Sequence, residues 1–195
     1  MSPSTTTVTI FGSGNMGTAI AEVARQGGAN VQHIGSAETD ARVSGDIVVL
    51  AVPHPAVEQV VATYGDQLVG RTVVDITNPL DFSTFDSLVV PADASKAAEL
   101  AAALPGAKVL KAFNTNFAAT LGSGRVGDAP TTVLVAGDDA EAKQGLVDLV
   151  TAGGLEAVDA GSLKRARELE ALGFLQLTLA AGDKVGWTGG FAVVR

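Results

Sequence analysis

The feature that most constrains the fold is a short apolar run over 8–11 that leads directly into the glycine-rich turn Gly12-Ser13-Gly14-Asn15-Met16-Gly17. After the turn, apolar residues recur at helical spacing until Gly27-Gly28 ends the pattern. These apolar positions are Met16, Ala19, Ile20, Val23 and Ala24. A strand, a G-x-G-x-x-G turn and a helix in this order are typical of a dinucleotide-binding βαβ unit. The sequence therefore predicts that the start of this helix binds a pyrophosphate.

Each glycine of the turn has its own expected purpose. Gly12 allows the tight turn, Gly14 lets the pyrophosphate approach the main chain, and Gly17 lets the helix pack closely on the strand. The free N–H groups and the dipole at the helix N-terminus attract phosphates. Because the chain has 23 glycines, the competing interpretation is a chance match in which the turn is purely structural.

Strand and helix patterns alternate along the rest of the chain. We expect strands over 8–11, 30–34, 46–52, 72–76, 108–113, 131–136 and 155–160. We expect helices over 16–26, 55–64, 96–104, 115–121, 138–151 and 163–181, with the second half of the last one buried. This alternation predicts an α/β fold of the Rossmann-like, doubly wound class, with a mostly parallel sheet and a C-terminal helix. No segment resembles a linker, so residues 1–195 are expected to form a single dinucleotide-binding domain.

The connection between the second and third expected strands is unusually short. Only about ten residues separate Gly35 from Asp46, whereas a parallel crossover through a helix usually needs a dozen or more. Ten extended residues span about 33 Å, so the chain can still return along the sheet. We therefore expect a shortened sheet edge beside the second strand.

Composition excludes several classes of function. The chain has no cysteine, which excludes disulfides, zinc–thiolate sites and thiol catalysis. Its net charge of −8 argues against nucleic acid and anionic membranes as partners. Neither a signal peptide nor an apolar run of about 20 residues is evident. We expect a cytoplasmic protein that binds small-molecule cofactors, with no metal site.

In this fold the ligand lies beyond the carboxyl ends of the strands, so each strand end is expected to form a wall of the site. After the second strand, an NAD site would normally have an acid that binds the ribose hydroxyls. This chain has Ser36 there, with Arg42 nearby, which favours the 2′-phosphate of NADP. Glu38 and Asp40 would repel that phosphate. The alternative is that Arg42 is a solvated surface charge and that NAD binds as well.

The third strand ends in Val52-Pro53-His54, whose main chain is expected to pass under the nicotinamide half of the cofactor. His54 is then a candidate for ring contact or for proton donation, because histidine titrates near neutral pH. The alternative is a structural role at the start of a helix, between two prolines.

The fourth and fifth strand ends supply the remaining candidates. Asn78-Pro79 offers an amide to the carboxamide or ribose, whereas Asp75, within the strand, is expected to be structural. The run Phe113-Asn114-Thr115 combines aromatic and polar groups, as does Phe117 after it, and this favours a flat ring with polar edges. The alternative is a helix cap with both phenylalanines in the core.

A basic cluster at the start of the last helix is expected to serve the helix itself. Lys164 and Arg167 lie where cations are unfavourable. Pairs between Lys164 and Glu168 and between Arg167 and Glu170 would offset this. An anionic ligand is the alternative.

Taken together, these motifs resemble the coenzyme F420-dependent NADP oxidoreductases over essentially the whole chain. The resemblance is carried by the glycine turn, Val52-Pro53, the run 75–80, Lys111-Ala112-Phe113-Asn114-Thr115, 166–170 and 186–190. It implies that NADPH lies along the strand ends, that a flavin-like ring stacks on its nicotinamide, and that the protein is a homodimer. Phe113, Asn114 and Thr115 would border this pocket. Metal-reducing membrane proteins contain a related domain with the same Lys-Ala-Phe-Asn-Thr run. One departure is Ser36-Ala37, where the family often has Ser-Arg.

The leading hypothesis is therefore an oxidoreductase that moves hydride between NADP(H) and F420 or a flavin. Its mechanism would depend on proximity and orientation, and the sequence names no catalytic acid or base. One alternative is an imine or pyrroline reductase, which needs about a hundred further helical residues. Another is a non-catalytic NADP-binding redox sensor.

Overall fold

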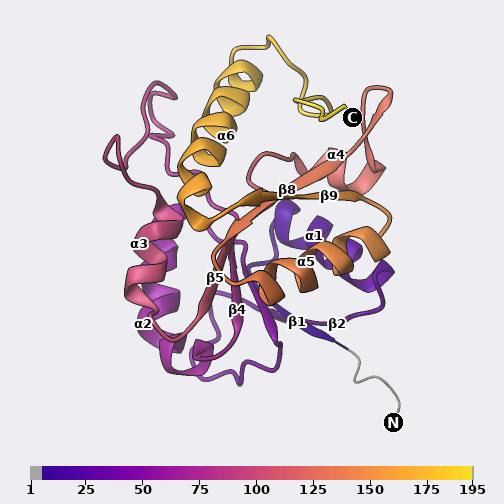
Figure 1. Cartoon of the computed structure of the whole chain (residues 1–195). Coiled ribbons are helices and arrows are strands. Elements are labelled where there is room, and N and C mark those ends of the chain that lie inside the picture. Colours follow the sequence, from indigo (N-terminus) through magenta and orange to yellow (C-terminus); the bar gives the residue numbers. More distant parts are fainter. Residues whose placement is uncertain (1–5, 195) are drawn as a thin grey trace.

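The computed structural model describes residues 6–194 and has a seven-stranded sheet at its centre, in the order β2-β1-β3-β4-β5-β8-β9 (Figure 1). The strands are β1 (Thr7–Phe11), β2 (Asn30–Ile34), β3 (Ile47–Leu50), β4 (Thr72–Asp75), β5 (Lys108–Lys111), β8 (Thr132–Gly137) and β9 (Glu156–Gly161). The first five pair in parallel. β8 is antiparallel to β5 and parallel to β9. The predicted Rossmann-like, mostly parallel α/β fold is confirmed.

Helices cover both faces of the sheet. They are α1 (Asn15–Gln26), α2 (Val57–Leu68), α3 (Lys96–Ala103), α4 (Ala118–Ser123), α5 (Ala140–Ala152) and α6 (Ala166–Ala181), with short 3₁₀ turns η1 (His54–Ala56) and η2 (Leu163–Arg165). Figure 1 shows α1 and α5 on one side of the sheet and α2 and α3 on the other. Successive strand residues point to opposite faces, so Val49 packs in the core beneath α1 and α5 while Leu50 packs beneath α2 and α3. The sequence thus buries two apolar cores, one on each face.

The shortened sheet edge is confirmed. β2 is the outer strand, and residues 35–46 contain neither helix nor strand. Side chains tie this connection down. The Nε2 of Gln32 donates to the carbonyl of Arg42 at 2.8 Å, and the Oε1 of Gln32 accepts from the Ser44 N–H at 3.0 Å. These bonds attach the connection to β2.

Several details differ from the sequence expectation. The stretch 122–130, where the sequence pattern gives neither a strand nor a helix, contains the two-residue strands β6 (Arg125–Val126) and β7 (Ala129–Pro130). The helix expected from 115 begins at Ala118, because Phe113 adopts a left-handed backbone with φ 61° that turns the chain first. The second half of α6 is only partly buried, with Leu175 49% exposed.

No helix within residues 6–194 combines the length and apolar content needed to cross a bilayer.

Candidate functional site

Two cavities lie at the carboxyl ends of the strands, one on each side of the glycine turn. The first, of about 310 Å³, lies between the turn, the end of β2 and α2. It is lined by Phe11, Gly12, Ser13, Gly14, Ile34, Gly35, Ser36, Glu38, Thr39, Ala51, Val52, Pro53, Ala56, Gln59, Val60, Thr63 and Tyr64. The second, of about 400 Å³, lies between the α1 N-terminus, the ends of β4 and β5, and α6. It is lined by Asn15, Met16, Ile76, Asn78, Phe113, Asn114, Asn116, Phe117, Ala118, Ala119, Leu177 and Trp187.

The glycine turn between these cavities has the geometry that a pyrophosphate requires. Gly12 has φ 101°, and a Cβ there would overlap the Ala51 carbonyl oxygen. A Cβ on Gly17 would lie 2.6 Å from the Gly12 oxygen, which shows how closely α1 approaches the turn. A Cβ on Gly14 would meet no protein atom within 4 Å, so this position faces open space.

The N-terminus of α1 is free to bind an anion. The first main-chain bond that closes the helix runs from the Thr18 N–H to the Gly14 oxygen at 2.9 Å. The preceding N–H groups of the first turn therefore have no partner within the helix. In this fully described helix no side chain caps the N-terminus, and its first turn contains no acid. The turn thus fits a dinucleotide pyrophosphate.

Paired amides form the floor of the second cavity. The Nδ2 of Asn78 donates to the Asn114 carbonyl at 2.9 Å, and the Nδ2 of Asn114 donates to the Asn78 Oδ1 at 3.0 Å and to the Leu169 carbonyl at 2.8 Å. The Oδ1 atoms of Asn114 and Asn116 are buried and have no donor within residues 6–194. Buried acceptors are rarely left unpaired in folded proteins. Two free amide oxygens beside one cavity fit a ligand that donates N–H groups.

An aromatic wall faces these amides. The rings of Phe117 and Trp187 lie 5.1 Å apart at 53°, and Trp187 is 53% exposed. Trp187 belongs to the segment after α6. Gln176 holds this segment in place, because its Nε2 donates to the Thr115 carbonyl at 3.1 Å and its Oε1 accepts from the Phe191 N–H at 3.0 Å. The Phe113 side chain instead packs in the core, as the alternative interpretation expects. The cavity therefore combines a flat apolar wall with polar acceptors.

No family model matches the chain. The F420-dependent NADP reductase of Methanocaldococcus jannaschii is 32% identical over 155 residues, which cover 77% of this chain and 69% of that protein. The F420-dependent NADP reductase of Methanothermobacter thermautotrophicus is 31% identical over 157 residues, covering 77% and 67%. The chain belongs to the F420-dependent NADP reductase family. It is an oxidoreductase.

Solved structures agree with this family assignment. The crystal structure of a candidate F420-dependent NADP reductase from Arthrobacter sp. FB24 superposes with a TM-score of 0.82 at 25% identity, covering 96% of this chain and 99% of that one. A reductive aminase from Aspergillus terreus, with a TM-score of 0.61 at 20% identity over 92% and 61%, shares the fold. A further relative by sequence is the metalloreductase STEAP3 of Rattus norvegicus, which is 37% identical over 107 residues, covering 55% of this chain and 21% of that protein.

In this member of the F420-dependent NADP reductase family, the two cavities bring together most of the predicted site residues. The first contains Gly12, Ser13, Gly14, Ser36, Val52 and Pro53, and the second contains Asn15, Met16, Asn78, Phe113 and Asn114. Five predicted residues line neither cavity: Gly17, Arg42, His54, Pro79 and Thr115. The sequence placed Glu38 near the 2′-phosphate without identifying it as a wall of the first cavity, and it did not identify Trp187 as a wall of the second. Trp187 offered one signal, as the sole tryptophan of the chain.

His54 does not line the first cavity, although its neighbour Pro53 does. Its side chain is half-buried, and its Nδ1 is buried with no partner in the described part of the chain. Burial lowers the pKa of His54, and the nearby Lys96 lowers it further. Asp75, Glu99 and Glu58 act in the opposite direction. The imidazole is therefore biased toward its neutral form.

A buried ion cluster lies beneath the amide floor. The Nζ of Lys111 contacts the Asp75 Oδ2 and the Glu170 Oε1, each at 2.8 Å, and all three side chains are at most 1% exposed. Lys111 also donates to the Thr77 carbonyl at 2.6 Å, and the Oδ1 of Asp75 accepts from the Thr77 N–H at 2.8 Å. Asp75 is thus structural. Burial raises the pKa of Glu170, while Lys111 opposes the rise. The cluster fixes the turn before Asn78 and attaches α6 to the sheet.

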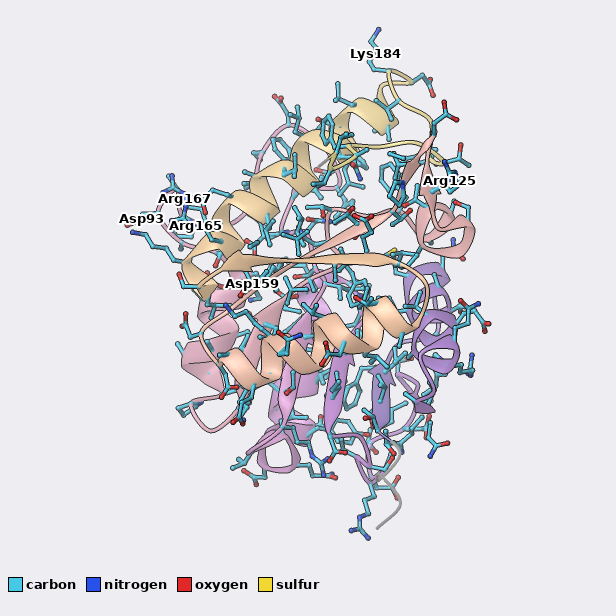
Figure 2. All side chains as sticks on the ribbon, turned by 45° about the vertical axis from the view of Figure 1, so that its right-hand side comes forward. Asp93, Arg125, Asp159, Arg165, Arg167 and Lys184 are labelled. Carbon is cyan, nitrogen blue, oxygen red and sulfur yellow. The ribbon has the colours of Figure 1, made fainter. Side chains whose placement is uncertain are left out.

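The expected ladder at the start of α6 is wrong. Glu170 pairs with Lys111 instead of Arg167, and it also accepts from the main-chain N–H of Lys96 at 2.9 Å. The pair that forms nearby is Arg165 with Glu168 at 3.5 Å. Figure 2 shows Arg165 and Arg167 pointing outward from the end of α6. The buried Lys111 is a stronger partner for the Glu170 carboxylate than the exposed Arg167, so Glu170 pairs with Lys111.

Proposed function

We propose that this protein transfers hydride between a nicotinamide dinucleotide, NADP(H) or NAD(H), and a flat ring acceptor of the flavin or F420 type. The observation that carries the proposal is the second cavity, whose lining combines two asparagines with unpaired amide oxygens and the aromatic rings of Phe117 and Trp187. Such a cavity fits a carboxamide-bearing ring on one side and a second ring on the other. The reductase names of the relatives support the same assignment.

The dinucleotide would extend across both cavities. Its adenosine half would lie in the first cavity, and its pyrophosphate would bind the free N–H groups at the α1 N-terminus. Asn114 and Asn116 would accept hydrogen bonds from the carboxamide. The bound dinucleotide supplies the hydride. The protein would hold the nicotinamide face open toward Trp187, against which the acceptor ring would stack.

Among the described residues, none that lines the second cavity has a titratable side chain. Catalysis would therefore depend on the proximity and orientation of the two rings. Transfer of hydride from ring to ring fits such a cavity. Reduction of an imine is less well supported, because an imine must be protonated and this lining offers no acid.

The direct test mixes the purified protein with NADPH and either F420 or FMN under anaerobic conditions. We expect NADPH absorbance to fall together with that of the acceptor. Trp187→Ala should raise the acceptor KM about fivefold, as the loss of a stacking contact worth about 1 kcal/mol implies. NADPH binding in calorimetry without turnover of either acceptor would favour the redox sensor instead.

The glycine turn is tested separately. Gly14→Ala adds a Cβ in open space, so the protein should remain as stable as the wild type while dinucleotide affinity falls tenfold or more. Gly12→Ala is the structural comparison, since it should cost about 1–3 kcal/mol of unfolding free energy. Unchanged NADPH affinity in Gly14→Ala would exclude this turn as the pyrophosphate site.

We further infer a cytoplasmic homodimer with no nucleic-acid partner, acting as one domain over residues 1–195. The single seven-stranded sheet supports one domain, and the net charge of −8 supports the absence of nucleic acid. Apolar side chains left exposed on and after α6 support a dimer.

A further inference from the structure

We propose that Glu38 is a specificity-determining residue of the first cavity, and that it lets this protein bind NAD(H) at least as tightly as NADP(H). The inference rests on the proposed function in one respect only, namely that the first cavity holds the adenosine ribose. It concerns the 2′ position of that ribose, which carries a hydroxyl in NAD and a phosphate in NADP.

Glu38 lines the first cavity, and hydrogen bonds hold both its main chain and its carboxylate there. Its Oε1 accepts from the Gly35 N–H at 2.8 Å, and its own N–H donates to the Gly35 carbonyl at 3.1 Å. Its carbonyl accepts from the buried Tyr64 hydroxyl at 2.8 Å, and the Tyr64 ring packs on Phe11 with 4.8 Å between centroids. These bonds place Glu38 at the cavity wall, with one carboxylate oxygen bound to the Gly35 N–H.

The remaining carboxylate oxygen is available to a ligand. Within residues 6–194 the Oε2 of Glu38 has no hydrogen-bond donor. Ser36 and Thr39 line the cavity beside it. A carboxylate accepts strongly from hydroxyl groups, so a free ribose 2′-hydroxyl would find an acceptor here.

A 2′-phosphate would meet the opposite situation. It would add nearly two negative charges beside the carboxylate, and none of the described residues lining the cavity is a lysine or arginine. Arg42 does not line this cavity. Uncompensated like charges at close range are unfavourable.

Calorimetry with ADP-ribose and 2′-phospho-ADP-ribose tests the proposal without involving the nicotinamide. We expect wild-type protein to bind ADP-ribose with equal or higher affinity. Glu38→Gln keeps an oxygen for the Gly35 N–H but removes the charge, so 2′-phospho-ADP-ribose should gain about tenfold relative to ADP-ribose. Asp40→Asn is the matched control, because it removes an exposed acid that does not line the cavity and should leave the ratio unchanged.

Ala37→Arg provides a second, independent variant. It adds a cation next to Ser36 without disturbing Glu38, and it should shift the ratio toward 2′-phospho-ADP-ribose by about tenfold. Thermal unfolding of every variant, monitored by circular dichroism, verifies that each one folds.

Three results would overturn the proposal: tenfold tighter binding of 2′-phospho-ADP-ribose by wild type, an unchanged ratio in Glu38→Gln, or binding of neither ligand. The last result would also remove the proposed function. Glu38-dependent selection of ADP-ribose together with no hydride transfer to any ring acceptor would support the inference and overturn the function alone.

Discussion

Lys111 shows how a single buried residue supports the site from below. It contacts two carboxylates and one carbonyl with its side chain 0% exposed, so its removal would leave Asp75 and Glu170 buried without a cation. Breaking a buried ion pair from one side typically costs 3–5 kcal/mol. We therefore expect Lys111→Met to lower the unfolding free energy by about 3–5 kcal/mol in urea denaturation.

The matched control is on the same strand. Lys108 pairs with Asp139 at 3.2 Å, and both side chains are about one-third exposed. Because exposed pairs contribute at most about 1 kcal/mol, Lys108→Met should change the stability little. Equal losses in the two variants would contradict the role assigned to Lys111.

His54 provides a prediction about pH. Burial and Lys96 lower its pKa in the folded state below the ordinary value of 6.5, so the unfolded chain binds the proton more readily. The stability that His54 contributes is therefore complete above pH 6.5 and falls as the pH drops through 6.5 toward the folded-state pKa. His54→Gln, which does not titrate, should reduce the loss of unfolding free energy between about pH 7 and pH 5.5.

The wild-type and His54→Gln curves are compared pairwise, so that Glu170 and the other acids contribute equally to both. NMR titration of the imidazole gives the folded-state pKa directly, and His33→Gln assigns the two histidine resonances. A His54 pKa above 6.5 would reverse the sign and exclude this account.

At the level of elements, α6 is the helix that closes the second cavity, and Gly173 sets its distance from the sheet. A Cβ at this position would overlap the Asn78 Oδ1 and would lie 2.9 Å from both the Nδ2 and the carbonyl oxygen of Asn114. Gly173→Ala should therefore push α6 outward and break the amide pair. We expect it to cost about 1–3 kcal/mol of stability and to weaken nicotinamide binding, measured by denaturation and by NADPH fluorescence.

Gly145 provides the opposite case in another helix. It lies exposed within α5, and a Cβ there would meet no atom within 4 Å. Because alanine favours helix more than glycine does, Gly145→Ala should stabilise the protein by up to about 1 kcal/mol. If Gly173→Ala behaved in the same way, the close approach of α6 would not matter to the site.

Most of the fold is predictable from the sequence, because most of its helices and strands have a regular hydrophobic pattern. Ile47–Leu50 is a continuous apolar run, which suits a central strand buried on both faces. The direction of β8 is not predictable in this way. It runs antiparallel to β5 because the chain reverses through α4 and the β6–β7 hairpin, and hydrophobic periodicity does not encode that route.

The candidate site is predictable only where it depends on local order. The glycine turn and the strand ends follow from sequence, because parallel strands bring their carboxyl ends to one edge. Glu38 and Trp187 do not follow, since each reaches its cavity through a distant contact. The Tyr64 hydroxyl binds the Glu38 carbonyl and so anchors Glu38. Gln176 binds the Phe191 N–H and so holds the segment that contains Trp187.

For the whole molecule, the decisive question is what covers α6 and the segment after it. Outside the second cavity, three large apolar side chains are exposed there: Leu175, Phe191 and Val194. An exposed apolar cluster of this kind marks a contact surface, and the proposed homodimer would bury it. We expect Leu175→Glu to raise the dimer dissociation constant at least about tenfold, because a charge on the partner-facing side of α6 would be desolvated.

Sedimentation velocity over a range of protein concentrations measures this shift. Val69→Glu is the control, because Val69 is 66% exposed but follows α2 at the opposite end of the sheet, and its substitution should leave the association unchanged. Glutamate is a good helix former, so Leu175→Glu should keep α6 intact, which circular dichroism verifies. A wild-type protein that sediments as a monomer throughout would exclude the dimer. Equal weakening in both variants would show that charge alone, and not the α6 surface, governs association.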